Sequence, residues 1–360
     1  MKVLFVLEYF PPYHGGVEKL FYHLTKSLSE KSVQITVLTA AYDDLPLEEY
    51  FGSIKVVRIK ARNRYHFSFN SIARAISLAK ECDVIHSSTY NAALPAWLAS
   101  KFSSKPIILT VHEYWNELWW RLPFLNFIQR LSFWSLEQFI LFLPFDKIIG
   151  VSTFTSEKLK KRLPRRSISM IYNGQKSMVQ PTEKERGNYY LYVGRLGVSK
   201  GIDVLVEAIA LASNRALNFK LVIPTSPKHI YQYLNETLSN SIASKKVELL
   251  HNVDDVTLFQ LMHNTKAIII PSYSEGFGFV ATEATSLKTP IIHSGKGALN
   301  EVVGGDLISF DNYSAEGLLN AILDAEDKKF KFKNPIEFPI EVTANQYLKE
   351  YTLLTATRPE

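Results

Sequence analysis

The chain has 360 residues, of which 46% are hydrophobic and 21% are charged, and its formal net charge at pH 7 is +6. This length and composition exclude a disordered chain and favour two globular domains, and the modest basic charge suits anionic ligands. The single cysteine, Cys82, excludes a disulfide framework and predicts a cytoplasmic protein, while the sequence contains no apolar run long enough for a spanning helix, no metal-ligand cluster and no nucleic-acid motif.

The first half of the chain alternates apolar strands with helical segments. Residues 2–7 form a nearly continuous apolar run, typical of a strand buried on both faces, and a loop with Gly15 and Gly16 leads into a predicted helix over 17–30. Such alternation predicts βαβ units and a parallel sheet. The further strands are predicted over 34–39, 55–59, 83–86, 106–111, 147–151 and 167–172, with helices near 70–80, 92–101 and after Ser152.

After Asn173 and Gly174 the pattern breaks, and the polar run 175–188 is interpreted as a linker. Two series of βαβ units predict two doubly wound halves with a cleft between them, where ligands bind beyond the carboxyl ends of the strands. The second series has predicted strands over 189–193, 220–223, 246–249, 267–270, 289–293 and 307–310, and helices near 202–213, 231–243, 256–264, 315–325 and from residue 279.

A strand, a glycine-containing loop and a helix are predicted over residues 267–284. Gly276 and Gly278 allow the backbone to approach a ligand closely, and the N–H groups at the start of the helix can bind an anion. Glu275 on the loop and Glu283 about one turn into the helix lie on either side of this anion site. The alternative is that the glutamates are ordinary surface charges and the glycines only shape a turn.

A second glycine-containing loop, residues 194–201, directly follows the strand 189–193 and precedes a helix. Its Arg195 and Lys200 can reach a diphosphate held at the start of that helix, the arginine through a planar fork and the lysine as a point charge. The alternative is a solvated basic loop, because basic surface residues are common.

Three motifs occur in order along the chain: Tyr9-Phe-Pro-Pro-Tyr-His-Gly15-Gly16-Val-Glu18, Gly194-Arg195-Leu followed after three residues by Lys200-Gly201, and Pro271-Ser followed by Glu275-Gly-Phe-Gly and Glu283-Ala. Together they resemble the nucleotide-sugar-dependent retaining glycosyltransferases of glycosyltransferase family 4. The resemblance implies an α/β protein with two Rossmann-like domains facing across a cleft, the GT-B fold. It implies an acceptor-side domain over 1–174, joined by a C-terminal helix within 341–360, and a nucleotide-sugar-binding domain over 175–340.

The resemblance also implies roles for the charged residues. Arg195 and Lys200 would bind the donor diphosphate and stabilise the charge that grows on the leaving phosphate, so that neither a metal nor another cofactor is needed. The sequence contains no Asp-x-Asp, which disfavours the metal-dependent glycosyltransferases. Glu283 would accept hydrogen bonds from the ribose hydroxyls, and Glu275 from the hydroxyls of the transferred sugar.

Other residues would complete this site. The amides of Gly276, Phe277 and Gly278 would hold the sugar and phosphate, and Gly15 and Gly16 would close over the phosphates or shape the acceptor side. His112, at the end of the strand 106–111, resembles the family histidine near the reacting face of the sugar. Its alternative is a hydrogen-bonded structural histidine.

The function implied is transfer of a sugar from a UDP- or GDP-sugar to a hydroxyl of a glycan or lipid-linked acceptor, in polysaccharide, glycolipid or glycoconjugate synthesis. Two departures from the family pattern leave the base open: residues 224–227 replace a glycine-rich turn, and His251-Asn252 stands where a glycine often occurs. The alternatives are an inactive homologue that only binds a nucleotide sugar or a partner, and a related nucleotide-sugar epimerase.

Residues 118–145 form an aromatic-rich helical region with few charges, and apolar residues cover almost every face. Trp119 and Trp120 beside Arg121 and Arg130 suit the headgroup region of a bilayer, so this segment predicts a peripheral contact with the inner face of the membrane. The alternative is that the C-terminal segment or another subunit covers the second apolar face.

Overall fold

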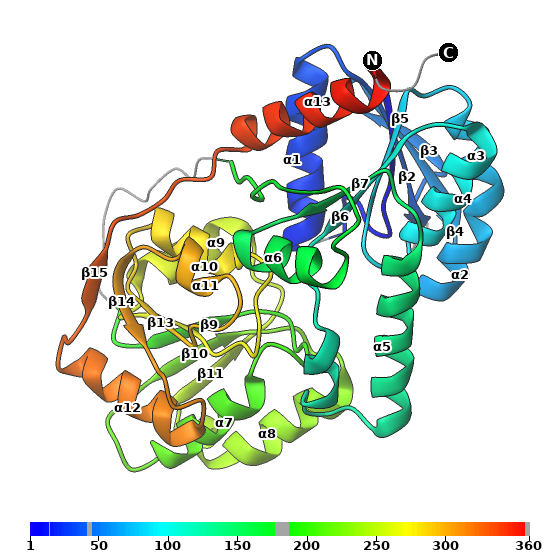
Figure 1. Cartoon of the computed structure of the whole chain (residues 1–360). Helices are drawn as coiled ribbons and strands as arrows, with labels where there is room; N and C mark the ends of the chain where they lie inside the picture. The colour runs from blue at the N-terminus through cyan, green and yellow to red at the C-terminus, as the bar shows by residue number, and fades with distance from the viewer. Residues whose placement is uncertain (14, 42–44, 177–186, 357–360) are drawn as a thin grey trace. The chain divides into compact units, whose positions relative to one another are not determined.

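A computed structural model describes residues 1–13, 15–41, 45–176 and 187–356 (Figure 1). The chain divides into two compact units. The first unit comprises Met1–Asn116, Leu131–Ser177 and Phe338–Glu360, and the second comprises Glu117–Arg130 and Met178–Glu337. Of the linker expected over 175–188, residues 177–186 lie outside the described residues, as does His14 of the first motif.

The first unit is built on a sheet in the order β3-β4-β2-β1-β5-β6-β7-β8, in which only β3 runs antiparallel to its neighbour. Its central strands are buried on both faces, as their continuous apolar sequences predict. The strands are β1 (Lys2–Val6), β2 (Gln34–Ala41), β3 (Glu48–Phe51), β4 (Ile54–Lys60), β5 (Val84–Ser88), β6 (Ile107–Val111), β7 (Lys147–Gly150) and β8 (Ile168–Met170).

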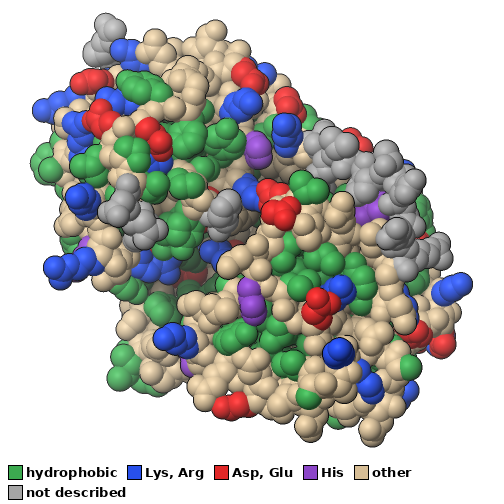
Figure 2. Space-filling model, turned by 180° about the vertical axis from the view of Figure 1, so that it is seen from behind, with side chains coloured by type: hydrophobic (Ala, Val, Ile, Leu, Met, Phe, Trp, Pro, Cys, Tyr) green, Lys and Arg blue, Asp and Glu red, His purple; other side chains and the backbone are tan. Residues whose placement is uncertain are grey.

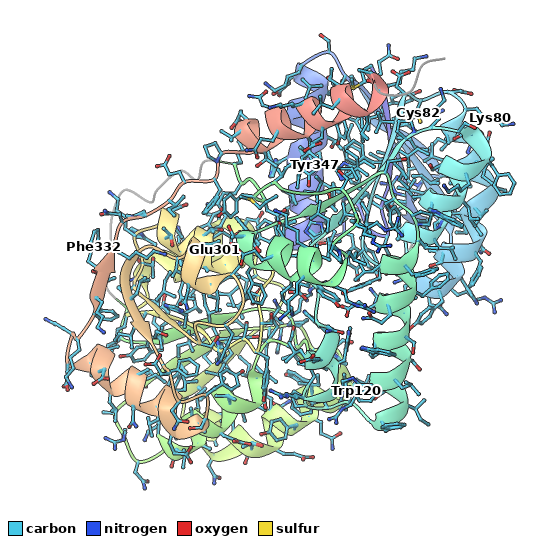
Figure 3. The ribbon with its side chains drawn as sticks, viewed as in Figure 1. Lys80, Cys82, Trp120, Glu301, Phe332 and Tyr347 are labelled. Atoms are coloured by element: carbon cyan, nitrogen blue, oxygen red, sulfur yellow. The ribbon has the colours of Figure 1, made fainter. Side chains whose placement is uncertain are left out.

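The helices of the first unit include the last one of the chain, α13, which packs beside α1. Tyr347 and Tyr351 of α13 are fully buried, and Tyr347 lies toward the sheet (Figure 3). The helices are α1 (Gly16–Glu30), α2 (Arg64–Asn70), α3 (Ile72–Ala79), α4 (Ala93–Ser103), α5 (Phe127–Phe142), α6 (Thr153–Arg162) and α13 (Ile340–Ala356), with a 3₁₀ helix η1 (Asn116–Trp120) before α5. η1 beyond Asn116 and the first turn of α5 belong to the second unit.

A polar network fastens α13 to the sheet. The imidazole of His86 on β5 bonds through Nδ1 to the hydroxyl of Tyr351 at 2.6 Å and through Nε2 to Thr110 Oγ1 at 2.7 Å. Thr110 Oγ1 is in turn 2.9 Å from the hydroxyl of Tyr347. Because these buried polar atoms are satisfied together, they fix α13 in one register over the sheet.

The second unit has a sheet in the order β11-β10-β9-β12-β13-β14-β15, parallel except for the last strand. The strands are β9 (Tyr190–Val193), β10 (Phe219–Val222), β11 (Val247–Leu250), β12 (Ile268–Ile270), β13 (Ile291–His293), β14 (Gly305–Ser309) and β15 (Lys331–Lys333). The helices are α7 (Ile202–Leu211), α8 (Lys228–Ala243), α9 (Asp255–Asn264), α10 (Phe279–Ser286), α11 (Leu299–Val302) and α12 (Ala315–Glu326).

The surface in Figure 2 shows basic, acidic and hydrophobic side chains interspersed. Within the described parts of the chain, no helix is long and apolar enough to cross a membrane. Those same residues contain no group of three or more His, Cys, Asp or Glu side chains that could hold a metal ion.

Candidate active site

Three loops of the second unit come together at one edge of its sheet. Strand β12 lies between β9 and β13, all three are parallel, and their carboxyl ends therefore meet at the same edge. The loop after β12 bonds to both neighbours: Tyr273 N donates to Ser199 O at 2.8 Å, and Ala298 N donates to Glu275 O at 2.8 Å. Residues 194–201, 271–278 and 294–298 thus form one continuous surface.

Two glycines make this close packing possible. Gly201 has φ +65°, and a Cβ there would lie 1.9 Å from the carbonyl oxygen of Pro271. Gly297 has φ +68°, and a Cβ there would lie 2.2 Å from the carbonyl oxygen of Glu275. Both positions therefore need glycine for its conformation and for its lack of a side chain. The sequence singles out the loop of Gly201 but gives Gly297 no role.

Lys200 and Glu275, predicted separately from two motifs, are in direct contact. Lys200 Nζ lies 2.9 Å from both carboxylate oxygens of Glu275, and the hydroxyl of Ser272 donates to Oε1 at 2.6 Å. The glutamate is buried and the lysine is half-buried, so the pair is only partly screened by water. Burial, and then the charge of Glu275, raise the pKa of Tyr192 beneath this loop above its usual value.

The remaining predicted residues of the second unit lie along the same loops. Arg195 is exposed at the carboxyl end of β9 and forms no ion pair with any residue the structure describes. Gly278, with φ +94°, is the N-cap of α10, and Glu283 is half-buried in the middle of that helix. Gly276 and Phe277 are buried between the carboxylate of Glu275 and the helix start. Cations, backbone N–H groups and carboxylates therefore occur on the loops, and on the helix that follows them, at this edge of the sheet.

The carboxyl ends of β10 and β11 extend this edge, and here His251 has a role that the sequence did not suggest. His251 Nδ1 is 2.7 Å from the carbonyl oxygen of Ile223, which can only accept, so Nδ1 carries the proton. Nε2 then accepts from the hydroxyl of Tyr231 at 3.1 Å. His251 therefore ties the ends of two strands to α8, where the sequence shows only a missing glycine.

In the first unit, His112 directly follows β6. Its ring meets that of Phe21 edge-on, with centroids 5.6 Å apart, and neither ring nitrogen has a hydrogen-bond partner among the described residues. Burial lowers its pKa to about 4, so the imidazole is neutral at pH 7. The hydrogen-bonded structural histidine considered as the alternative is not what the geometry shows.

The loop after His112 is held by a buried carboxylate, that of Glu137 on α5. Glu137 accepts hydrogen bonds from the backbone N–H groups of Trp115 at 2.9 Å and Asn116 at 2.7 Å, and from the hydroxyl of Tyr90 at 2.8 Å. Three donors thus satisfy this carboxylate within the protein. In the sequence, Glu137 stands out only as one of the few charged residues of the apolar segment 118–145.

Gly15 and Gly16 lie at the start of α1. Gly15 is extended, with φ −179°, and forms the N-cap, while Gly16 is the first helical residue. A Cβ on Gly15 would lie 2.0 Å from the Oε2 atom of Glu18, a buried side chain in the first turn of the helix. A larger residue at this position would therefore require the Glu18 carboxylate to move, whereas the backbone conformation of Gly15 is one that any residue can adopt.

A second buried carboxylate of the first unit, Glu8, follows β1. Arg64 binds it with two hydrogen bonds, Nε to Oε1 at 3.0 Å and Nη2 to Oε2 at 3.2 Å, and Asn91 Nδ2 donates to Oε2 at 2.9 Å. The partners are 56 and 83 residues away in the chain, so no local sequence signal could have found them. Both oxygens of Glu8 thus accept hydrogen bonds from within the protein, which makes this pairing a structural element.

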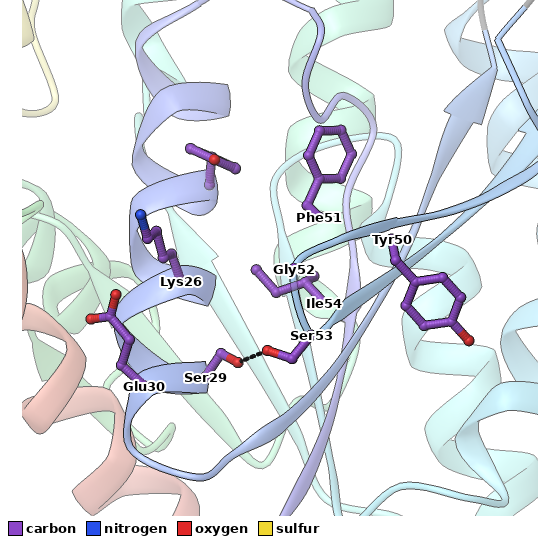
Figure 4. A pocket seen from close by; sticks show the side chains of 9 residues that line it. Lys26, Ser29, Glu30, Tyr50, Phe51, Gly52, Ser53 and Ile54 are labelled. Atoms are coloured by element: carbon purple, nitrogen blue, oxygen red, sulfur yellow. Dashed lines mark hydrogen bonds between the residues drawn. The ribbon is translucent and has the colours of Figure 1, made fainter.

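An open hollow of about 500 Å³ lies elsewhere in the first unit, between the C-terminal half of α1 and the β3–β4 hairpin (Figure 4). Its walls include Lys26, Tyr50 and Phe51, and Ser29 and Ser53 bridge one end with their hydroxyls 2.5 Å apart. None of the residues predicted for the site lines it. We therefore place the candidate active site at the strand edges and not in this hollow.

Comparison with known proteins identifies families for both halves of the chain. The sequence profile of Glycosyltransferase Family 4 matches residues 14–175, and that of Glycosyl transferases group 1 matches residues 174–337. The uncharacterized glycosyltransferase MJ1178 of Methanocaldococcus jannaschii is 31% identical over 353 residues, covering 94% of this chain and 93% of the relative. The GDP-mannose:cellobiosyl-diphosphopolyprenol alpha-mannosyltransferase of Xanthomonas campestris is 24% identical, covering 79% of this chain and 76% of that one.

Solved structures match the fold over almost its whole length. Sucrose-phosphate synthase from Thermosynechococcus elongatus superimposes with a TM-score of 0.81 at 19% identity, covering 99% of both chains. Anabaena HepE in complex with UDP-glucose superimposes with a TM-score of 0.70 at 17% identity, covering 98% of this chain and 100% of that one. The expected fold class, α/β with two Rossmann-like domains of the GT-B type, is confirmed.

Proposed function

This chain belongs to glycosyltransferase family 4, and from that membership we propose that it moves one sugar, with retention of configuration, from a nucleotide diphosphate sugar to a hydroxyl group. The observation that carries the proposal is the pair formed by Lys200 and Glu275 at the joined glycine loops, with 2.9 Å from the ammonium to each carboxylate oxygen. A cation and a carboxylate at one strand edge match the two ends of such a donor, its diphosphate and its sugar hydroxyls.

Donor binding would exchange partners within this pair. The diphosphate takes the ammonium of Lys200 and the guanidinium of Arg195, and the carboxylate of Glu275 is then available to accept hydrogen bonds from sugar hydroxyls. Ser272, 2.6 Å from Oε1, keeps the carboxylate oriented during the exchange. Glu283 binds the ribose hydroxyls, and the N–H groups around Gly276, Phe277 and Gly278 hold the phosphate and the sugar.

The chemistry then depends on the charge of the leaving group. As the bond between the anomeric carbon and the phosphate oxygen breaks, negative charge grows on the diphosphate, and Arg195 and Lys200 stabilise it in place of a metal ion. The acceptor oxygen bonds to the anomeric carbon on the face that the phosphate leaves, and its proton passes to the departing phosphate oxygen. The neutral imidazole of His112 is suited to bonding a sugar hydroxyl without adding charge.

The acceptor is proposed to be a glycan or a lipid-linked sugar in polysaccharide, glycolipid or glycoconjugate synthesis. The mannosyltransferase relative is named for a diphosphopolyprenol-linked acceptor, which supports a lipid-linked substrate. We place the protein in the cytoplasm at the inner face of the membrane, with its contact in the segment 118–145.

A donor screen tests the proposed function. The protein is incubated with UDP- and GDP-sugars and an extract of lipid-linked and soluble glycans, in the presence of EDTA, and the nucleoside diphosphate released is measured. We expect one nucleotide and one sugar to give turnover that EDTA does not abolish. Binding of a nucleotide sugar by calorimetry without release from any donor would instead support an inactive, nucleotide-sugar-binding homologue.

A further inference from the structure

Helix α5 turns an apolar stripe to the solvent. Phe127, Ile128, Leu131, Phe139 and Phe142 are all exposed, up to 77% for Phe142. At about 100° per residue these positions fall within roughly 120° of the helix circumference, where Ser135 and Gln138 separate the apolar residues of the first turns from Phe139 and Phe142. The opposite face, with Ile140 and Leu141, is buried. A surface helix normally shows the reverse distribution on its outer face, so this stripe is expected to meet an apolar phase.

Of Trp119 and Trp120, only Trp120 reaches this surface. Trp119, which the sequence suggested as a membrane contact, is buried at 7% exposure, whereas Trp120 is exposed at 37% (Figure 3). The ring of Trp120 lies 5.9 Å from that of Phe127, at the start of α5. The exposed apolar surface is therefore centred on α5, and Trp120 only extends one end of it.

A basic cluster borders the C-terminal half of this stripe. Arg162 of α6 donates to the Oε1 atom of Gln138 at 3.2 and 3.0 Å, and Arg166 donates to the carbonyl oxygen of Phe142 at 2.8 Å. Arg162 and the exposed rings of Phe139 and Phe142 line one shallow depression of about 360 Å³. Lys161 and Arg165 are exposed basic residues that neighbour Arg162 and Arg166 in the sequence.

We propose that the stripe of α5 and the basic cluster of α6 bind the surface of a bilayer that contains anionic lipid. The phenylalanine and aliphatic side chains enter the boundary between headgroups and acyl chains, while the lysines and arginines bond lipid phosphates. Glu157 is the only acidic residue of α6, so little within the helix opposes this attraction. The inference sharpens the proposed membrane contact, moves it toward residues 127–166, and is tested without any transferase activity.

The charge distribution argues against a second copy of this chain as the occupant. A two-fold contact brings the same patch of both copies together, and the basic clusters beside Phe139 and Phe142 would then face each other. An anionic bilayer satisfies both the apolar stripe and its basic border.

Vesicle flotation tests this inference. The wild type is mixed with vesicles of phosphatidylcholine containing phosphatidylglycerol, or of phosphatidylcholine alone, and the fraction that rises in a density gradient is measured. We expect the protein to rise with the anionic vesicles, and less at high salt. The variants Phe139→Ser/Phe142→Ser and Lys161→Glu/Arg165→Glu are each expected to bind at least about tenfold more weakly, because the first loses apolar insertion and the second reverses two charges near the anionic surface.

Matched variants control for loss of apolar surface and for net charge. Leu211→Ser/Phe332→Ser removes two exposed apolar side chains of the second unit, and Arg62→Glu/Lys80→Glu reverses two exposed charges of the first. Both controls should float as the wild type does, and circular dichroism should show all four variants folded.

The inference is overturned if the wild type stays at the bottom with anionic vesicles, if the controls lose as much binding as the test variants, or if light scattering shows a dimer that Phe139→Ser/Phe142→Ser dissociates. Donor turnover in solution should be the same in all variants, so a failed donor screen leaves the flotation result intact.

Discussion

Glu275 of the second unit and Glu137 of the first are both buried carboxylates that hold loops following a parallel strand, yet they are satisfied differently. Glu137 accepts from two backbone N–H groups and a tyrosine hydroxyl, all fixed by the fold. Glu275 accepts from Ser272 and from the ammonium of Lys200, which is at the end of a flexible side chain. None of the donors to Glu137 can leave the carboxylate while the fold stays intact.

This difference determines which of the two carboxylates can bind a ligand. A lysine side chain can turn to a phosphate at little cost, whereas releasing a backbone N–H from Glu137 requires the loop to refold. Glu8 is intermediate, because the buried Asn91 binds it together with the side chain of Arg64, which is partly exposed. Burial alone therefore does not identify a functional carboxylate, but an exchangeable partner does.

The largest expected effect tests the exchangeable pair. Lys200→Ala and Arg195→Ala should each lower turnover about a hundredfold or more, because loss of one cation at a developing anion costs about 3 kcal/mol. Single-turnover kinetics with the identified donor measure this, and Lys245→Ala, an exposed lysine of the second unit, serves as control. Turnover within a few-fold of wild type in both variants would show that Arg195 and Lys200 belong to a solvated basic loop with no role in catalysis.

Glu137→Gln should break the structural carboxylate without touching the donor site. The amide keeps one oxygen acceptor and places its NH2 group opposite the backbone N–H of either Trp115 or Asn116, so the free energy of unfolding should fall by about 2 kcal/mol. Urea denaturation followed by tryptophan fluorescence measures the loss. Donor affinity should stay as in the wild type, and a variant that lost donor affinity but not stability would reverse the roles assigned to Glu137 and Glu275.

The parts of the site that could be predicted are those with a local signal. Lys200 and Glu275 each lie in a glycine loop directly after a buried strand, and the parallel order of β9 and β12 brings the loops together. Glu8 and Glu137 could not be found this way, because their donors come from distant parts of the chain and obey no spacing rule. Their ion pairing and hydrogen bonds exist only once the sheet has formed.

The fold was predictable to a similar extent. Continuous apolar runs identified the parallel strands, but the antiparallel edge strands β3 and β15 were not expected, since they are short and largely exposed. In the segment 118–145 the composition indicated an apolar surface without telling which side chains face outward. Trp119 is buried and Phe142 is exposed because the course of the chain around η1 and α5, and not hydrophobicity, decides this.

Glu283 offers a smaller effect that separates binding from chemistry in the second unit. If Glu283 binds ribose, Glu283→Ala should raise the donor Kd about tenfold and leave turnover at saturating donor nearly unchanged. Glu275→Ala should lower turnover as well, because the role proposed for that carboxylate is to position the sugar. Calorimetry and steady-state kinetics measure the two quantities, and equal small effects of both substitutions would assign both glutamates to structure alone.

The smallest effect is expected for His86. Like Glu137, this histidine is buried and its hydrogen-bond partners belong to the fold. Burial lowers the pKa of His86 to about 3, well below the usual value near 6.5 of an unfolded chain. As the pH falls, His86 therefore binds a proton in the unfolded state but not in the folded state. The free energy of unfolding consequently decreases as the pH falls from about 6.5 toward 3. Between pH 7 and pH 6 the loss should be about 0.7 kcal/mol for one such histidine.

Urea denaturation of the wild type and His86→Gln at both pH values measures this loss. The variant should be less stable at both pH values, because it disturbs the bonds to Thr110 and Tyr351. Its free energy of unfolding should nevertheless fall less between pH 7 and pH 6 than that of the wild type. The same fall in both proteins would show that His86 is protonated alike in the folded and unfolded chain.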